Sequence, residues 1–350
     1  MSLFIIAADR KIDSIGSHQE TEGLLSQAIK KNLKITNLEI VNLSKRWENK
    51  LNSHQFKSGA SAMAAINEVR KIIQAKKTDL VVIKGEDLLK TGYPPGEREN
   101  FMKLYNNKFT PLDGYNELVP MFLKKFKISE KTYFSLRDDL FKNYTLTWKK
   151  NNTNAIMPHE KWFQPLTKYF RGVDCANPNI DFSAQMILAS KKTADLLKIP
   201  LKSRIEILGN SFVKIKVDGF ESLPKIAPYL HLKRAIAKAL VQAKINFKNK
   251  FNKGEAFLEA YTCYPVVPLA LILKLGLVSS ADEIHTFLNN HEITVTGGLN
   301  LARAPWSLTS LNSIIVMRER LRSTSTKKYG LVHGNGSLGN QQGITILKKV

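Results

Sequence analysis

Two side chains of this 350-residue chain lie where they could carry covalent chemistry. Cys263 follows an expected strand and precedes Pro265 by two positions, and a thiol there could be a nucleophile if its pKa were lowered. A buried, unreactive cysteine is the alternative. His333 directly precedes a glycine-rich run and is the best-placed acid or base, although a lone histidine is more often structural.

Glycine-rich segments lie on both sides of an expected helix near the C-terminal end. Gly297 and Gly298 precede this helix, and Gly334 and Gly336 follow the strand after it. Glycine loops at strand ends can bring backbone N–H groups to a substrate oxyanion. Tight turns in an ordinary α/β domain are the alternative. The seven histidines and two cysteines show no zinc-binding spacing, so no metal is expected.

The chain is strongly basic, with 53 Lys and Arg against 30 Asp and Glu and a formal net charge of +23. Nucleic acid, an anionic membrane surface and a phosphate-bearing ligand are possible partners. The lysines are spread between apolar helical positions, which favours a solvated surface and makes nucleic acid the least favoured partner. No apolar stretch reaches transmembrane length, and Asp9 and Arg10 interrupt the first apolar run too early for a signal peptide, so a cytoplasmic protein is expected.

Periodicity predicts alternating strands and helices, with Ser307 as the N-cap of the last helix. Strands are expected over 3–8, 38–41, 79–84, 181–190, 205–217, 255–261, 293–296, 329–332 and 343–346. Helices are expected over 21–31, 62–75, 191–197, 229–243, 266–275 and 308–321. Between about 93 and 172 the pattern changes to short amphipathic helices broken by Pro and Asn, which indicates an insertion over the sheet domain.

Two parts of the chain resemble each other. In residues 58–85 and again in 297–334, a small-residue loop opens a helix, the helix ends in basic residues, and a strand follows that ends at glycine. The repetition indicates a duplicated α/β unit. Coincidence is the alternative, because helix followed by strand is common in α/β proteins.

The ordered set of motifs resembles the thiolase superfamily, closest to thiolase-like proteins related to sterol-carrier-protein-type thiolases. The segments YTCYP (261–265), TVTGG (294–298) and GLVHGNG (330–336) are similar to three successive family motifs. Upstream, residues 59–67 with 79–85 are similar to the N-terminal nucleophile loop, helix and strand. The similarity extends over most of the chain and is weak between Tyr93 and Trp162.

This resemblance implies an α/β, thiolase-like fold of two similar halves. Each half would have a mixed five-stranded sheet with helices, layered αβαβα. The halves would be 1–218, which contains the helical insertion of about 93–172, and 219–350. The resemblance also implies acyl-CoA as substrate or ligand, no other cofactor, and a homodimer formed through the N-terminal half.

The sequence departs from the family pattern at the catalytic positions. The loop at Ser58 to Ser61 holds no cysteine, Arg303-Ala304-Pro305 replaces the family's Gly-His-Pro, and Asn335-Gly336-Ser337 replaces its Cys-x-Gly. Claisen chemistry needs an activated thiolate and a base. Thiolase activity is therefore expected to be weak, altered or absent.

Three function classes follow. The first is an acyltransferase with an altered site: Cys263 as nucleophile, His333 as base and Asn335 as oxyanion donor. Residues at the family's substrate positions are Ser58, Gly59, Ser61, Tyr261, Gly297, Gly298, Gly334 and Gly336. The second, slightly favoured on chemistry, is a non-catalytic thiolase-fold subunit that binds acyl-CoA or a partner chain in a hetero-complex. The third, least favoured, is a nucleic-acid-binding protein. In the first two, lysines of the insertion would face the phosphates of CoA.

Overall fold

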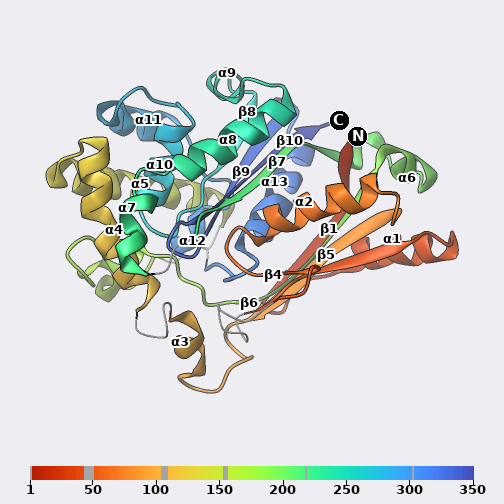
Figure 1. The fold of residues 1–350 in the computed structure, drawn as a ribbon, viewed down its shortest axis with the longest axis horizontal. Coiled ribbons are helices and arrows are strands. Elements are labelled where there is room, and N and C mark those ends of the chain that lie inside the picture. The colour runs from red at the N-terminus through yellow and green to blue at the C-terminus, as the bar shows by residue number, and fades with distance from the viewer. Residues whose placement is uncertain (1, 43–50, 104–108, 153–156, 217–218, 302) are drawn as a thin grey trace.

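The structure is a computed structural model that describes residues 2–42, 51–103, 109–152, 157–216, 219–301 and 303–350. Strands and helices alternate along most of the chain (Figure 1). The strands are β1 (Leu3–Ile12), β2 (Ile15–Gly16), β3 (Ile35–Ile40), β4 (Gln55–Phe56), β5 (Leu80–Leu88), β6 (Asp181–Ser190), β7 (Ile205–Lys214), β8 (Ala256–Glu259), β9 (Tyr329–Gly336) and β10 (Gln341–Lys349).

The helices of the sheet-forming parts are α1 (Gln19–Lys30), α2 (Ser61–Gln74), α6 (Lys191–Leu196), α7 (Leu223–Ile226), α8 (Leu230–Ala243), α9 (Phe247–Asn252), α10 (Val266–Lys274), α11 (Ile284–Asn290), α12 (Gly298–Leu301) and α13 (Thr309–Ser323). The insertion adds α3 (Glu97–Met102), α4 (Pro111–Phe126) and α5 (Glu130–Asn151). Short 3-10 helices are η1 (Glu160–Phe163), η2 (Gly172–Asp174), η3 (Leu201–Ser203), η4 (Phe220–Ser222) and η5 (Ala281–Glu283).

The described strands form one hydrogen-bonded mixed sheet with an internal symmetry. Its order is β4-β3-β5-β6-β1-β7-β10-β9-β8, with β2 paired to β1. The run β3-β5-β6-β1 has one parallel pair followed by antiparallel pairs, and β8-β9-β10-β7 repeats this pattern from the other end. The two runs meet through only two residue pairs of β1 and β7, Phe4 with Glu206 and Ile5 with Ile205. The arrangement agrees with the expected α/β class and with two similar sets of strands.

Side-chain alternation along β1 shows how the layers are stacked. Leu3 and Ile5 pack with the apolar faces of α2 and α13 and with strands of the second set. Phe4 and Ile6 point to the other face, where they pack with α1 and α6. Helix α8 covers the outer face of the second set of strands. The contact includes a hydrogen bond of 2.6 Å that the Ser211 hydroxyl on β7 donates to the Ala235 carbonyl. Helices α2 and α13 therefore lie between the two sets of strands, in an αβαβα arrangement (Figure 1).

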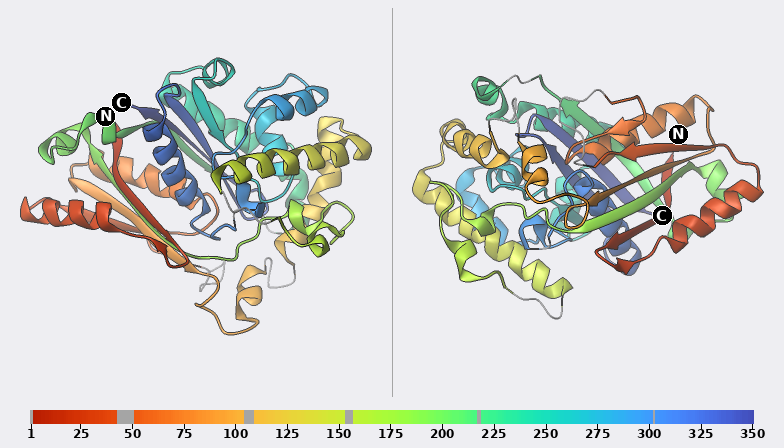
Figure 2. Two further views of the ribbon diagram at one scale, coloured as in Figure 1. Left: turned by 180° about the vertical axis from the view of Figure 1, so that it is seen from behind. Right: turned by 90° about the horizontal axis from the view of Figure 1, so that it is seen from below.

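The insertion is built around helices longer than the short ones expected. Helix α4 has 16 residues and α5 has 22. Thr110 and Asp113 form a capping box at the start of α4, and the Ser129 hydroxyl caps α5. These helices lie at one end of the molecule, beside α11 and far from α1 (Figure 2). The Asn143 amide fixes α5 to the second half by donating to the carbonyls of Leu288 and His291, both at 2.8 Å.

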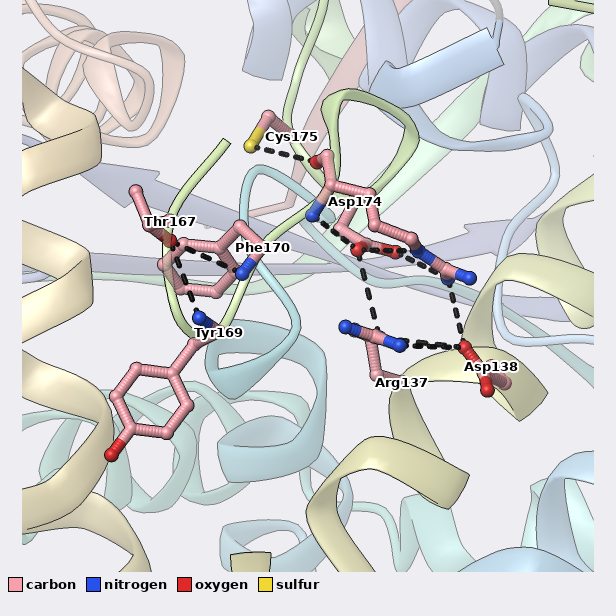
Figure 3. A network of polar contacts seen from close by, with 8 residues as sticks. Arg137, Asp138, Thr167, Tyr169, Phe170, Asp174 and Cys175 are labelled. Carbon is pink, nitrogen blue, oxygen red and sulfur yellow. Dashed lines mark hydrogen bonds and ion pairs between the residues drawn. The ribbon is translucent and has the colours of Figure 1, made fainter. Parts of the chain in front are cut away.

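Four charged side chains bind the end of the insertion to α5. The Arg171 guanidinium lies 2.8 Å from the Asp174 carboxylate and 2.9 Å from that of Asp138, and Arg137 lies 3.6 Å from Asp174 (Figure 3). Asp174 is buried, so these partners compensate the cost of removing its charge from water. The network positions η2 and the following Cys175.

Three local expectations are wrong. Residues 293–296 do not form a strand, because their backbone N–H groups are used elsewhere: Glu259 accepts from Val295 and Thr296. The second set therefore has four described strands, whereas the first reaches five through the two-residue β4. Ser307 is not an N-cap, since α13 begins at Thr309 without a side-chain cap. The run 334–336 belongs to strand β9, because it pairs with β10.

The predicted limit between 218 and 219 stays a prediction, because residues 217 and 218 lie outside the described residues. Strand β7, just before this limit, pairs with β10 along its whole length. Within the described residues, no helix combines the length and the apolar character needed to cross a membrane. A cytoplasmic location remains a prediction.

Helix α8 approaches β7 so closely that only glycine fits at residue 209. A Cβ atom on Gly209 would lie 2.1 Å from the Ala239 carbonyl oxygen, which is backbone and cannot rotate away. We expect Gly209→Ala to lower the free energy of unfolding by about 2–3 kcal/mol, as overpacked substitutions do, measured by urea denaturation. Gly23→Ala is the matched control on exposed α1, where a Cβ meets nothing within 4 Å, and should stabilise by about 1 kcal/mol. Equal effects of the two substitutions would contradict this packing.

Candidate functional site

A cavity of about 320 Å³ lies where the insertion meets both halves; we call it the Cys263 cavity. Tyr115 on α4 forms part of its wall, and Cys263 follows β8. Gly59 before α2, Ala304 before α13 and Asn335 on β9 also line it. The other polar and small residues of the wall are Glu99, Thr110, Ala176, Tyr261, Thr309 and Ser337. The remaining wall is largely apolar and aromatic: Met102, Pro111, Leu112, Pro178, Tyr264, Leu299, Pro305 and Trp306. The cavity thus joins positions from six separate parts of the sequence.

Cys263 is a protonated thiol in this cavity. Its side chain is buried, and Sγ donates to the Tyr115 hydroxyl at 3.7 Å. Burial raises the pKa of the Cys263 thiol to about 12, which outweighs the opposing hydrogen bonds from Tyr115 and Asn335. The thiolate population at neutral pH is therefore very small, whereas a nucleophilic cysteine needs a lowered pKa.

His333 is held as a neutral, fully buried imidazole. Its Nε2 shares a hydrogen bond of 2.7 Å with Gln342 Oε1, and burial lowers the pKa of His333 to about 4. Gln342 Nε2 in turn donates to Asn335 Oδ1 at 2.6 Å. No hydrogen bond between described residues joins His333 to Cys263 directly. Between the described residues, the hydrogen-bonded path from the imidazole to the cavity runs through the amide side chains of Gln342 and Asn335, which do not relay protons as a histidine does.

Asn335 and Tyr115 present the polar edge of the cavity. Asn335 Nδ2 donates to the Tyr115 hydroxyl at 2.7 Å and lies 3.6 Å from Cys263 Sγ. The Tyr115 hydroxyl donates to the Ser337 carbonyl at 3.4 Å, and its ring stacks on Tyr264 with centroids 4.2 Å apart. Burial raises the pKa of Tyr115 well above its ordinary value, so it remains a neutral donor. Two donors near one thiol form a pair that could bind a carbonyl oxygen.

Sequence reasoning missed Tyr115, because it lies on an insertion helix outside every motif. The only local signal is its place on a buried helical face with Leu118, Val119 and Phe122. That pattern indicates core packing and does not indicate a binding role.

The two predicted serine positions form hydrogen bonds inside the protein. Ser58 Oγ accepts from the Ala60 N–H at 3.2 Å, and Ser61 Oγ donates to the Ser307 carbonyl at 2.8 Å. Both serines are buried and neither lines the Cys263 cavity. Gly59 does line it, and a Cβ there would lie 2.2 Å from both the Asn335 carbonyl and the Tyr261 hydroxyl. Tyr261 also lines it, and its role as a substrate position remains a prediction.

The other predicted glycines serve packing. A Cβ on Gly334 would meet Met63 Sδ at 2.8 Å, and one on Gly336 would meet Ser58 Oγ at 2.9 Å. Gly297 packs against the backbone of Trp148, and Gly298 approaches Thr262 Oγ1. These glycines do not line the Cys263 cavity, because their backbone approaches neighbouring elements.

Two buried carboxylates that sequence reasoning also missed hold the loop between β8 and α13. Asp87, at the end of β5, accepts from the N–H groups of Trp306 at 2.9 Å and Leu308 at 3.0 Å. Glu259, at the end of β8, accepts from the Val295 N–H at 2.6 Å. Burial raises the pKa of each carboxyl to about 7, against the hydrogen bonds that lower it. They position the loop that carries Ala304 without entering the cavity.

No group of three His, Cys, Asp or Glu side chains in the described part of the chain could hold a metal ion. The described hydrogen-bond partners of the Cys263 thiol, Tyr115 and Asn335, are both neutral groups.

No protein-family model matches the sequence, and no curated protein matches it either. The structure is similar to the crystal structure of a monomeric SCP2-thiolase like protein type 1 from Mycobacterium smegmatis. The TM-score is 0.72 at 16% sequence identity, over 99% of this chain and 77% of that chain. The fold is thiolase-like. This confirms the fold that the motif resemblance implied.

The raised pKa of Asp87 predicts a distinct pH dependence of stability. Because the pKa rises from 3.8 to about 7 in the folded state, the stabilising contribution is complete below pH 4 and is lost as the pH rises through 7. Asp87→Asn removes this titration. We expect the free energy of unfolding of Asp87→Asn, relative to wild type, to increase by roughly 2–4 kcal/mol from pH 4.5 to pH 8, measured by urea denaturation.

Asp195→Asn is the comparison variant, because the contribution of Asp195 to the free energy of unfolding should change with pH in the opposite direction to that of Asp87. Hydrogen bonds from Lys191 and Arg204 lower the pKa of Asp195, so its contribution is lost as the pH falls. Parallel stability curves for wild type and Asp87→Asn would show that Asp87 does not titrate in this range.

Proposed function

We propose that this protein binds acyl-CoA thioesters, with the acyl group in the Cys263 cavity, and has weak or no thiolase activity. The observation that carries the proposal is the protonated Cys263 thiol beside two neutral donors in a largely apolar cavity. Apolar walls suit an acyl chain, and a few placed polar groups suit its carbonyl.

The thioester carbonyl would accept from Asn335 Nδ2 and from the Tyr115 hydroxyl. The present hydrogen bond of Tyr115 to the Ser337 carbonyl is long, at 3.4 Å, so the hydroxyl can turn to a ligand at little cost. These donors polarise the carbonyl, but acyl transfer also requires a thiolate and a proton acceptor. Cys263 has no such acceptor among its described hydrogen-bond partners, which are Tyr115 and Asn335. Binding without cleavage is the outcome that this chemistry favours.

The positive charge of the chain supports an anionic ligand. The insertion contributes lysines near the cavities, among them Lys161 on η1. Lysine ammonium groups suit phosphates as point charges. We infer that the nucleotide part of CoA follows the insertion, while the acyl part enters the Cys263 cavity.

Paired variants test the binding and the chemistry together. Ala304→Trp fills the cavity, because Ala304 is a small, buried wall residue, and should weaken butyryl-CoA binding at least tenfold by calorimetry. Ala237→Trp, at an exposed position of α8, is the matched control and should leave the affinity unchanged. Cys263→Ala should change the affinity less than threefold, because the thiol forms no bond to the ligand.

Acetoacetyl-CoA thiolysis should remain near background for wild type and for Cys263→Ala. Robust wild-type turnover that is lost in Cys263→Ala would establish a nucleophilic thiol and overturn the proposed non-covalent role. Absence of any butyryl-CoA binding by wild type would overturn the ligand assignment.

We also propose that two copies associate through the N-terminal half, as the motif resemblance implies. The structurally similar Mycobacterium smegmatis protein is described as monomeric, so the two assemblies would differ. Light scattering at micromolar concentration should give twice the mass of one chain. A single-chain mass under these conditions would remove the homodimer.

A further inference from the structure

Two neighbouring helical segments carry exposed aliphatic side chains at the end of the molecule opposite the insertion. Ile29 on α1 is 63% exposed, Leu196 on α6 is 49% exposed and Leu201 on η3 is 59% exposed. Helices α1 and α6 lie side by side there, far from α4 and α5 (Figure 1 and Figure 2). Because single exposed aliphatic residues are common on protein surfaces, the residues around them decide whether they have a role.

Packing joins α1 and α6 into one surface. Ala28 of α1 and Leu197, directly after α6, belong to the same buried cluster on one face of the first set of strands. The Gln27 side-chain amide also donates to the Leu197 carbonyl at 3.4 Å. The exposed neighbours of these residues in the chain, Ile29 and Leu196, therefore lie on the same surface.

Lysines surround these aliphatic side chains. Lys198 and Lys202 lie on either side of Leu201 in the chain, and Ile199 between them packs against the same buried cluster. The exposed lysines of this surface are Lys30, Lys31, Lys34, Lys192, Lys198 and Lys202. Across the described residues, none of these lysines belongs to an ion pair. We call them, together with Ile29, Leu196 and Leu201, the α1–α6 patch.

The turn between α2 and β5 adds positive charge at the rim of the α1–α6 patch. It carries Lys76 and Lys77, which are both exposed. The turn contacts the patch, because the Thr78 hydroxyl donates to the Lys34 carbonyl at 2.8 Å. The patch and its rim thus concentrate part of the net charge of +23 at one end of the molecule.

Two carboxylates close to the α1–α6 patch are bound to other groups of the protein. Asp79 accepts from the Lys34 N–H at 2.8 Å. Asp195 forms ion pairs with Lys191 and Arg204, at 2.7 and 2.5 Å. The lysines of the patch outnumber these carboxylates, so the surface is positively charged as well as apolar.

The combination of lysines with aliphatic side chains favours an anionic lipid surface over other partners. Aliphatic side chains can enter the boundary between headgroups and acyl chains while lysine ammonium groups stay at the headgroups. Single-stranded nucleic acid is bound largely through aromatic stacking, and α1, α6 and η3 contain no aromatic residue. A two-fold contact between copies would place the patch against itself, where the lysines would repel one another.

We propose that the α1–α6 patch is a peripheral binding site for anionic membrane lipids. Ile29, Leu196 and Leu201 enter the boundary between headgroups and acyl chains, and the lysines bind the lipid phosphates as point charges. The patch lies at the start of β5, where the Leu80 N–H donates to the Lys34 carbonyl at 3.2 Å. Asp87, which holds the loop beside the Cys263 cavity, lies at the other end of this strand.

Sedimentation of the full chain with lipid vesicles tests the proposal without acyl-CoA, so its outcome is independent of the function proposed above. Vesicles of phosphatidylcholine with about one third phosphatidylserine should bind wild type about tenfold or more tightly than vesicles of phosphatidylcholine alone. High salt should weaken this binding, because it screens the lysines from the headgroups.

Matched pairs of lysine variants separate the α1–α6 patch from the general positive charge. Lys198→Gln with Lys202→Gln should weaken binding to the phosphatidylserine vesicles roughly 25-fold, since each lysine near an anionic surface contributes about fivefold. Lys238→Gln with Lys248→Gln changes the net charge equally, at exposed positions of α8 and α9, and should change binding by less than about twofold.

A pair of leucine variants tests the apolar contribution. Leu201→Gln should weaken vesicle binding about tenfold, because it removes an aliphatic side chain from the boundary between headgroups and acyl chains. Leu146→Gln on α5 is the matched control, since Leu146 is 60% exposed, and should leave binding unchanged. All these side chains are exposed, so each variant should unfold at the wild-type temperature.

Equal binding to both kinds of vesicle, or equal effects of a patch variant and its control, would overturn the proposal. Two further results would also overturn it in the absence of vesicle binding. Weaker RNA binding by the patch variants would identify a nucleic-acid surface, and a halved mass in light scattering would identify a contact between copies.

Discussion

The buried carboxylate of Asp87 is the contact on which the site most depends. It lies at the end of β5 in the first set of strands and accepts from backbone N–H groups at the start of α13 in the second. These hydrogen bonds to one carboxylate fix the position of the two halves relative to each other at the cavity. Glu259 holds the other end of this loop within the second half, through the N–H groups of Val295 and Thr296. The position of Ala304, and hence the shape of the Cys263 cavity, follows from these two anchors.

The layered architecture explains why such anchors must be polar and buried. Helices α2 and α13 are enclosed between two sets of strands, so the loops that lead into them are removed from water. Their backbone N–H groups need partners inside the protein. Asp87 and Glu259 supply them, and the same burial raises the pKa of both carboxyls. Burial is thus the reason both that the two carboxyls are needed to hold these loops and that they titrate near neutral pH.

Burial also decides the chemical character of the site. Cys263, His333 and Tyr115 are all shielded from water, and each is shifted toward its neutral form. Neutral donors beside a protonated thiol can bind and orient a carbonyl group, but they do not supply the charged nucleophile and the proton acceptor on which covalent acyl transfer depends.

The sequence by itself determined most elements of this protein, because helical and strand periodicity are local properties. The expected strands at 181–190 and 205–217 and the helix at 62–75 agree with the structure within a few residues. Cys263 and Tyr261, which the motif at 261–265 singled out, both line one cavity, and their role at a substrate remains a prediction. The residues at 293–296 show the limit of this reasoning, since their strand-like composition was outweighed by the distant Glu259 carboxylate.

Only the tertiary structure decided what the site residues can do. The protonated state of Cys263 depends on burial, and the partner of its thiol, Tyr115, lies 148 residues away in the chain. The neutral state of His333 also depends on burial, with Gln342 across the β9–β10 pair as its partner. A pKa is set by neighbours in space and by access to water, and neither is encoded in local spacing. For the same reason no motif indicated Tyr115.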